Sequence, residues 1–233
     1  VLPDVILCNS AISASAKGKA WRQAIALLAE MRCGGLEPVL ITYSAEVSAC
    51  EKSEAWERAF ILMAEMQHES IERDLIVCNA VVSTCAKGQQ WEHAWGMVME
   101  MQVDVLDPDV ITYSAAVSAF EKRAKWEHAM DLLTTTLWEG LLADVMLYSA
   151  VISAYGKGGQ WERMLGMLVD MRLTKLEPNV ITCSAAISAC EKGGRWVEAL
   201  GLLGDMWQSS MAPNVITYNS AISACEKGGQ WER

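Results

Sequence analysis

Apolar and polar residues recur along this chain with a period of 35 residues, which is marked most clearly by tryptophan. A fixed period of this length indicates a tandem array of structural repeats. The tryptophans that keep the spacing are Trp21, Trp56, Trp91, Trp126, Trp161, Trp196 and Trp231. We therefore expect a single array over residues 1–233, with its function distributed over the repeats. The predicted repeats cover 5–39, 40–74, 75–109, 110–144, 145–179, 180–214 and, truncated, 215–233, after the tail of a preceding repeat at 1–4.

Each repeat contains two amphipathic segments. The first is apolar at repeat positions 1, 4, 8 and 11, and the second at positions 17, 20, 21, 24 and 27, which are the spacings of helix faces. We name them helix A and helix B. Helix A is predicted to end near a Lys-Gly or Lys-Gly-Gly sequence, as at Lys192-Gly193-Gly194, and every proline lies at position 34, after helix B: Pro3, Pro38, Pro108, Pro178 and Pro213. One hairpin cannot bury both apolar faces, so neighbouring hairpins are predicted to stack into an all-α solenoid, with the tryptophan wedged in the core between A and B.

Composition restricts the functional classes. The chain is 52% hydrophobic without an apolar run of membrane-spanning length, so no membrane association is expected. A formal net charge of -10 argues against indiscriminate, charge-driven nucleic-acid binding but permits a local basic stripe. The three histidines have no nucleophile or metal partner at a recognisable spacing, so we expect no enzyme, metal, cofactor or small-molecule substrate. Seven of the eight cysteines share two repeat positions and are predicted to be buried, reduced thiols.

Residues Val215 to Gly229, the helix B pattern that begins at Trp196, and the loop from Leu176 to Asn179 resemble the pentatricopeptide repeat family in its 35-residue, P-type form. The resemblance covers the whole chain. Tetratricopeptide repeats differ, because they have a 34-residue period and carry their tryptophan in the first helix. The resemblance implies a right-handed α-solenoid superhelix of stacked antiparallel hairpins, organellar localisation in a mitochondrion or chloroplast, and a chain that is a piece of a longer array.

A second face of helix A contains positions 2, 5, 9 and 13. Position 5 is always Asn or Ser, and position 9 is always serine: Ser13, Ser48, Ser83, Ser118, Ser153, Ser188 and Ser223. Position 13 is always lysine: Lys17, Lys52, Lys87, Lys122, Lys157, Lys192 and Lys227. We expect a groove with an apolar floor, short polar groups above it and a lysine edge, which suits single-stranded RNA. The lysines and serines alone are equally compatible with helix capping and packing. The acids Glu51, Glu121, Glu191 and Glu226 precede four of the lysines and would weaken that edge.

The resemblance implies roles for these positions. Position 2 would sandwich the base: Ile6, Ile41, Ile76, Ile111, Met146, Ile181 and Ile216. Position 13 would approach the RNA backbone. Positions 5 and 35 together would select the base, and these residues are Asn9, Ser44, Asp74, Asn79, Asp109, Ser114, Asp144, Ser149, Asn179, Ser184, Asn214 and Asn219. Position 35 of the first repeat is Val39, which departs from the family pattern and leaves only a pyrimidine preference.

The implied pairs are Ser with Asp for guanine, Asn with Asp for uracil and Ser with Asn for adenine. The expected ligand is therefore a single-stranded RNA, 5′-YGUGAAY-3′, bound for RNA processing, stability, editing or translation. The alternative is a helical-repeat scaffold for protein–protein interaction without RNA binding, which the acidic charge would suit. A positive stripe on helix A favours RNA, and a uniformly acidic groove favours a protein partner.

Overall fold

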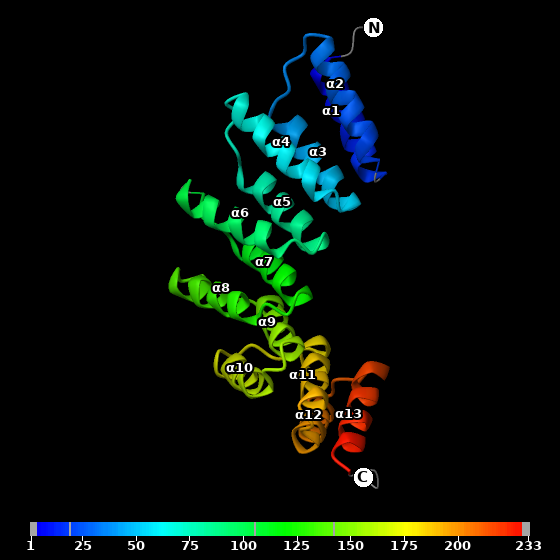
Figure 1. The fold of residues 1–233 in the computed structure, drawn as a ribbon, viewed down its shortest axis with the longest axis vertical. Coiled ribbons are helices and arrows are strands. Elements are labelled where there is room, and N and C mark those ends of the chain that lie inside the picture. Colours follow the sequence, from blue (N-terminus) through cyan, green and yellow to red (C-terminus); the bar gives the residue numbers. More distant parts are fainter. Residues whose placement is uncertain (1–3, 19, 105, 142, 230–233) are drawn as a thin grey trace. The chain divides into compact units, whose positions relative to one another are not determined.

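The structure is a computed structural model that describes residues 4–18, 20–104, 106–141 and 143–229, and within them it consists of thirteen α-helices without strands (Figure 1). Pro3 and Trp231, which the repeat pattern includes, lie outside the described residues. Residue contacts divide the chain into two compact parts, Val1–Ala119 and Phe120–Arg233. The all-α fold of helix hairpins predicted from the sequence is confirmed.

In the N-terminal part, odd-numbered helices are the A helices and even-numbered helices are the B helices. The helices are α1 (Val5–Lys17), α2 (Trp21–Cys33), α3 (Leu40–Ser53), α4 (Trp56–His68), α5 (Leu75–Lys87), α6 (Trp91–Val103) and the beginning of α7 (Val110–Lys122). Helix α3 packs against both α1 and α5, so the A helices lie side by side. Each B helix packs against the A helix of its own hairpin, and α2 and α4 also contact the A helix of the next repeat (Figure 1).

The C-terminal part repeats this arrangement. Its helices after the end of α7 are α8 (Trp126–Trp138), α9 (Val145–Lys157), α10 (Trp161–Leu173), α11 (Val180–Lys192), α12 (Trp196–Gln208) and α13 (Val215–Lys227). Helix α11 packs against α9 and α13, and the B helices α10 and α12 each contact the A helices on both sides. Each part is therefore a stack of hairpins in which the A helices form one continuous layer.

More positions of the A helices are buried than the predicted apolar positions 1, 4, 8 and 11. Positions 4, 8 and 11 are buried in interior repeats, as in Tyr113, Val117 and Phe120, but position 1 is only half-buried. Positions 3 and 10 are also buried, as in Thr112 and Ala119. An interior A helix is flanked by hairpins on two sides, and a pattern of one apolar face does not reveal the second contact because small and hydroxyl residues occupy it.

The prediction that the periodic tryptophan is a core wedge within its own hairpin holds for Trp21, which packs against the cluster of Ile12, Ala16, Ala24 and Ala49, but it omits a contact with the next repeat. The periodic tryptophans that the structure describes are half-buried at the start of helix B. The indole of Trp161 lies against Gly193, at the end of helix A in the next repeat, where an added Cβ would come within 2.7 Å of the indole Cδ1. At Gly194 glycine is favoured by the backbone conformation instead of by close packing, because its φ of +67° lies in the left-handed region. As with Trp161 and Gly193, the indoles of Trp56, Trp126 and Trp196 lie against a glycine of the next repeat, so these tryptophans also pack between repeats.

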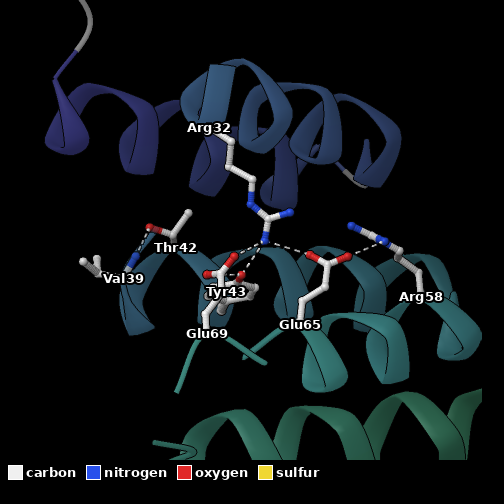
Figure 2. Close-up of polar contacts among 7 residues, drawn as sticks. All are labelled: Arg32, Val39, Thr42, Tyr43, Arg58, Glu65 and Glu69. Carbon is white, nitrogen blue, oxygen red and sulfur yellow. Dashed lines mark hydrogen bonds and ion pairs between the residues drawn. The ribbon is translucent and has the colours of Figure 1, made fainter. Parts of the chain in front are cut away.

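A polar network joins the first two repeats. The Arg32 guanidinium contacts the hydroxyl of Tyr43 at 2.6 Å and the carboxylates of Glu65 and Glu69 at 3.0 and 2.8 Å, and Figure 2 shows these side chains converging on it from helices α3 and α4 and the residue after α4. Glu46, at position 7 of the second repeat, is 1% exposed, and its two carboxylate oxygens have no hydrogen-bond partner among the described residues. Burial raises the pKa of Glu46 to about 7, against the opposing effect of the Arg58 charge.

The cysteines have the environment expected for reduced thiols. All eight are free, and all but Cys33 are buried. Burial raises the pKa of Cys85 to about 12 and that of Cys78 to about 11, so both thiols remain protonated and unreactive at neutral pH. Within the described residues, no helix has the length and apolar character needed to cross a membrane, and no cluster of three or more His, Cys, Asp or Glu side chains could hold a metal ion.

Candidate nucleic-acid interface

The position-2 side chains project from the first turn of every A helix. Their exposed fractions range from 60% for Met146 to 75% for Ile6. Large apolar side chains exposed at one fixed position of every repeat are not explained by folding, because each loses the free energy that burial would supply. Within each of the two compact parts, these residues form a row of apolar contacts available to a ligand.

Positions 5 and 9 lie lower, between neighbouring A helices. Ser149 and Ser184 are buried, at 7% and 8% exposure, while the serines at position 9 are half-buried. The predicted groove is therefore inverted: the polar residues form its floor and the apolar residues project above it. The reason is that positions 5 and 9 face the adjacent A helix, whereas position 2 lies in the first turn, which the neighbouring helix does not cover.

The position-35 residue is the N-cap of the next helix A. Asp144 Oδ1 accepts a hydrogen bond from the Leu147 amide at 2.8 Å, and Asn179 Oδ1 accepts one from the Thr182 amide at 2.9 Å. The same bond occurs at Asp74, Asp109 and Asn214. Asp and Asn are preferred N-caps, as are Ser and Thr, so helix capping alone favours these residues at position 35 but does not exclude the hydroxyl side chains. The other polar atom of the side chain is not used by this bond and could contact a ligand. It is a hydrogen-bond acceptor in Asp and a donor in Asn.

Positions 5 and 35 of one repeat are close enough to act together. In the third repeat, the Asn79 amide nitrogen donates to Asp109 Oδ1 at 3.2 Å. The two side chains come from the beginning of α5 and from the N-cap of α7, which are separated in the sequence by 30 residues. A base placed above this pair could contact both.

Val39 is the exception at position 35. Its side chain cannot accept a hydrogen bond, so the Thr42 amide bonds to the Val39 carbonyl at 2.8 Å instead, and the Val39 amide donates to the Thr42 hydroxyl (Figure 2). The valine side chain is 42% exposed at the surface where the other repeats present a carboxylate or an amide. The first repeat therefore lacks both the cap and the second polar group.

The lysines at position 13 are exposed, and the glutamates at position 12 neutralise some of them. Glu51, Glu121 and Glu191 form ion pairs with Lys87, Lys157 and Lys227, at 2.9, 2.9 and 3.0 Å. The expected weakening of the positive edge is thus confirmed for these three, although each glutamate pairs with the lysine of the following repeat instead of the lysine next to it in the sequence. The edge is neither uniformly basic nor uniformly acidic.

One cleft on this face brings the predicted positions together. It has a volume of about 380 Å³ and lies over helices α9, α11 and α13 of the C-terminal part. Its lining includes Ser184 at position 5, Ile216 at position 2 of the next repeat, and the lysines Lys157 and Lys192. The cleft therefore combines an apolar side wall, a hydroxyl floor and cationic groups.

A threonine at position 3 belongs to the same surface and was not predicted. Thr182 Oγ1 lies 2.5 Å from Ser149 Oγ and donates to Asn179 Oδ1 at 2.9 Å, so it joins positions 5 and 35 of the preceding repeat. Thr112 similarly contacts Asn79 and Asp109. The signal in the sequence is the recurrence of threonine at a buried position, in Thr42, Thr112, Thr182 and Thr217.

The family is established by its sequence models. The pentatricopeptide repeat domain matches residues 1–52, 61–123 and 136–195, and the PPR repeat family matches residues 178–227. These matches cover most of the chain, which therefore belongs to the pentatricopeptide repeat family. No curated protein sequence matches significantly.

Solved structures agree on the fold. The crystal structure of the pentatricopeptide repeat protein PPR10 from maize matches with a TM-score of 0.71 and 27% identity, over 95% of this chain and 32% of that one. PPR10 in complex with an 18-nt psaJ RNA element matches with a TM-score of 0.59 and 17% identity, over 97% of this chain and 38% of that one. The PPR domain of Arabidopsis thaliana protein-only RNase P 1, in complex with tRNA, matches with a TM-score of 0.66 and 14% identity, over 76% of this chain and 93% of that one. The chain thus spans about a third of the length of the maize protein.

Proposed function

We propose that this chain binds single-stranded RNA along the exposed face of its A helices, one nucleotide per repeat, in the service of organellar RNA processing, stability, editing or translation. The observation that carries the proposal is the row of position-2 side chains, each at least 60% exposed. Unpaired bases require flat apolar contacts together with polar groups at their edges and cations near the phosphates. The RNA complexes of PPR10 and of protein-only RNase P 1 support RNA as the ligand class.

Base selection would rest on the second atom of the position-35 side chain. Since the N-cap bond uses Oδ1, Asp144 presents a free carboxylate oxygen, whereas Asn179 presents its amide nitrogen. A carboxylate can accept hydrogen bonds from the Watson–Crick donors of guanine, and an amide donor suits adenine, which has an acceptor at that edge. This chemistry supports guanine at the repeats with Ser44 and Ser114, and adenine at those with Ser149 and Ser184.

The test is a binding titration at moderate salt with 5′-YGUGAAY-3′ and a scrambled oligonucleotide of the same composition. We expect tighter binding of the first. Equal binding to both would refute base selection but would still support RNA binding. Binding to neither would refute the proposed function and favour the protein–protein scaffold.

A second test changes the base preference directly. The double substitution Ser149→Asn and Ser184→Asn is expected to move the preference at two steps from adenine toward cytosine. The matched control is Ser153→Asn with Ser188→Asn, which makes the same change at position 9 of the same two repeats and should leave base preference unchanged. An unaltered preference in the position-5 variant would show that position 5 does not select bases here.

A further inference from the structure

The glutamates at position 12 follow a two-repeat alternation. Even-numbered repeats carry Glu51, Glu121 and Glu191, whereas odd-numbered repeats before the last carry Ala16, Ala86 and Gly156. In each of the three acidic cases, one carboxylate oxygen binds two groups of the following repeat. It accepts hydrogen bonds from the position-9 serine hydroxyl and from the position-13 lysine ammonium.

The geometry is nearly identical in the three copies. Ser83 and Lys87 lie 2.7 and 2.9 Å from Glu51 Oε1, and Ser153 and Lys157 lie 2.8 and 2.9 Å from Glu121 Oε1. The corresponding distances from Glu191 Oε1 are 2.9 Å to Ser223 and 3.0 Å to Lys227. Partial burial raises the pKa of Glu191, but hydrogen bonds from Lys227 and Ser223 outweigh it and hold that pKa below its usual value. The carboxylate is therefore charged at neutral pH.

Two of the lysines whose preceding repeat has a small residue at position 12 differ from these. The repeat before Lys52 has Ala16 at position 12, and the repeat before Lys192 has Gly156 there. Within the described part of the chain, neither has a carboxylate within ion-pair distance. An ammonium that is already paired releases few counterions when a phosphate approaches it, because its charge is largely compensated in the free protein.

We infer that the position-12 glutamates prevent phosphate binding by the lysine of the next repeat, so that Lys87, Lys157 and Lys227 contribute little to backbone binding, whereas Lys52 and Lys192 bind the RNA phosphates. This inference rests on the proposed function. It assigns Glu51, Glu121 and Glu191 the role of setting the affinity and salt dependence of binding without selecting bases. An array with a net charge of -10 would then hold RNA mainly by base contacts and would show a weak response to salt.

The test is the triple substitution Glu51→Ala, Glu121→Ala and Glu191→Ala, which gives the even-numbered repeats the small residue found in odd-numbered ones. Affinity for 5′-YGUGAAY-3′ is measured over a series of salt concentrations. Release of three lysines should steepen the slope of log K against log salt by about 2, since each phosphate contact on a single strand contributes about 0.7. Binding at low salt should also become tighter.

The matched control removes the same charge elsewhere. Glu57, Glu92 and Glu127 are exposed glutamates in the first turn of B helices. Their triple replacement by alanine changes the net charge equally but releases no position-13 lysine, and we expect little change in the slope. An equal change in both variants would assign the effect to net charge and overturn the inference.

Amine labelling followed by mass spectrometry tests the ion pairs without RNA. Lys87, Lys157 and Lys227 should react more slowly than Lys52 and Lys192, and the triple variant should abolish the difference. If the wild-type chain binds RNA and the triple variant shows the same slope, this inference alone fails. If neither protein binds any RNA, the proposed function fails with it. Binding gained only by the triple variant would refute RNA binding by the natural chain and, with it, the inferred role of the glutamates in that binding.

Discussion

Neutralising Glu46 should stabilise the protein in a pH-dependent way. This side chain is 1% exposed and lacks a hydrogen-bond partner among the described residues, so ionisation inside the fold is unfavourable. Burial raises its pKa from an ordinary value of 4.5 to about 7, and the Arg58 charge only partly offsets that effect. The substitution Glu46→Gln keeps the shape and removes the ionisation.

The size of the effect follows from the two pKa values. The folded state holds the proton of Glu46 more tightly than the unfolded state, so the contribution of Glu46 to wild-type stability falls as the pH rises from about 4.5 to about 7 and is constant above that range. Relative to a permanently neutral side chain, the loss is near zero at pH 4, about 1 kcal/mol at pH 5 and about 3 kcal/mol at pH 8.

The assay is urea unfolding followed by far-UV circular dichroism at pH 5 and pH 8. We expect Glu46→Gln to exceed the wild type at pH 8 and to approach it at pH 5. The control is Glu57→Gln, a glutamate on the surface of α4, which should change stability little at either pH. A Glu46→Gln variant with the same stability difference at both pH values would refute the assignment of a raised pKa to this group.

Three further predictions concern single positions. Val39→Asp should cap α3 through the Thr42 amide, raise stability by about 1 kcal/mol in thermal unfolding, and move the first-repeat preference from either pyrimidine to uracil; no change in melting temperature would contradict the capping argument. Gly193→Ala should destabilise by about 1–3 kcal/mol in urea unfolding, because its Cβ would lie 2.7 Å from the nearest indole atom, whereas Gly201→Ala, with open space around the new methyl group, should be neutral or stabilising. Cys33 should be the first thiol to react with a maleimide under native conditions, as detected by mass spectrometry, since the other seven cysteines are buried; equal labelling of several cysteines would show that the repeats open readily.

The fold could be predicted because its determinants are periodic and local. The apolar spacing and the turn residues recur in every repeat, so the helix content and the hairpin arrangement follow from the sequence. The position of the tryptophans could not be derived, because their spacing fits a contact within the hairpin as well as one with the next repeat. The packing of Trp161 against Gly193 shows the contact with the next repeat.

The candidate interface was predictable to a lesser degree. Positions 2 and 13 can be found from the helical period, and both are exposed, although position 2 projects above the groove in which it was expected to form the floor. The partner of Glu51 could not be found, because Lys52 is adjacent in the sequence whereas the actual partner, Lys87, lies 36 residues away. Likewise, the contact between Thr182 and Ser149 spans 33 residues and depends on the distance between A helices, which repeat spacing alone does not give.

The N-cap role of position 35 has a consequence for how such an array could change its target. Under the proposed function, an exchange of Asp for Asn at this position would alter the preferred base while the bond from Oδ1 to the helix amide is kept. Most other residues would forfeit that bond, at about 1 kcal/mol in each repeat. Mutation would therefore move the array between a small set of target sequences without loss of fold, because both residues that select the base are also among those that start a helix well.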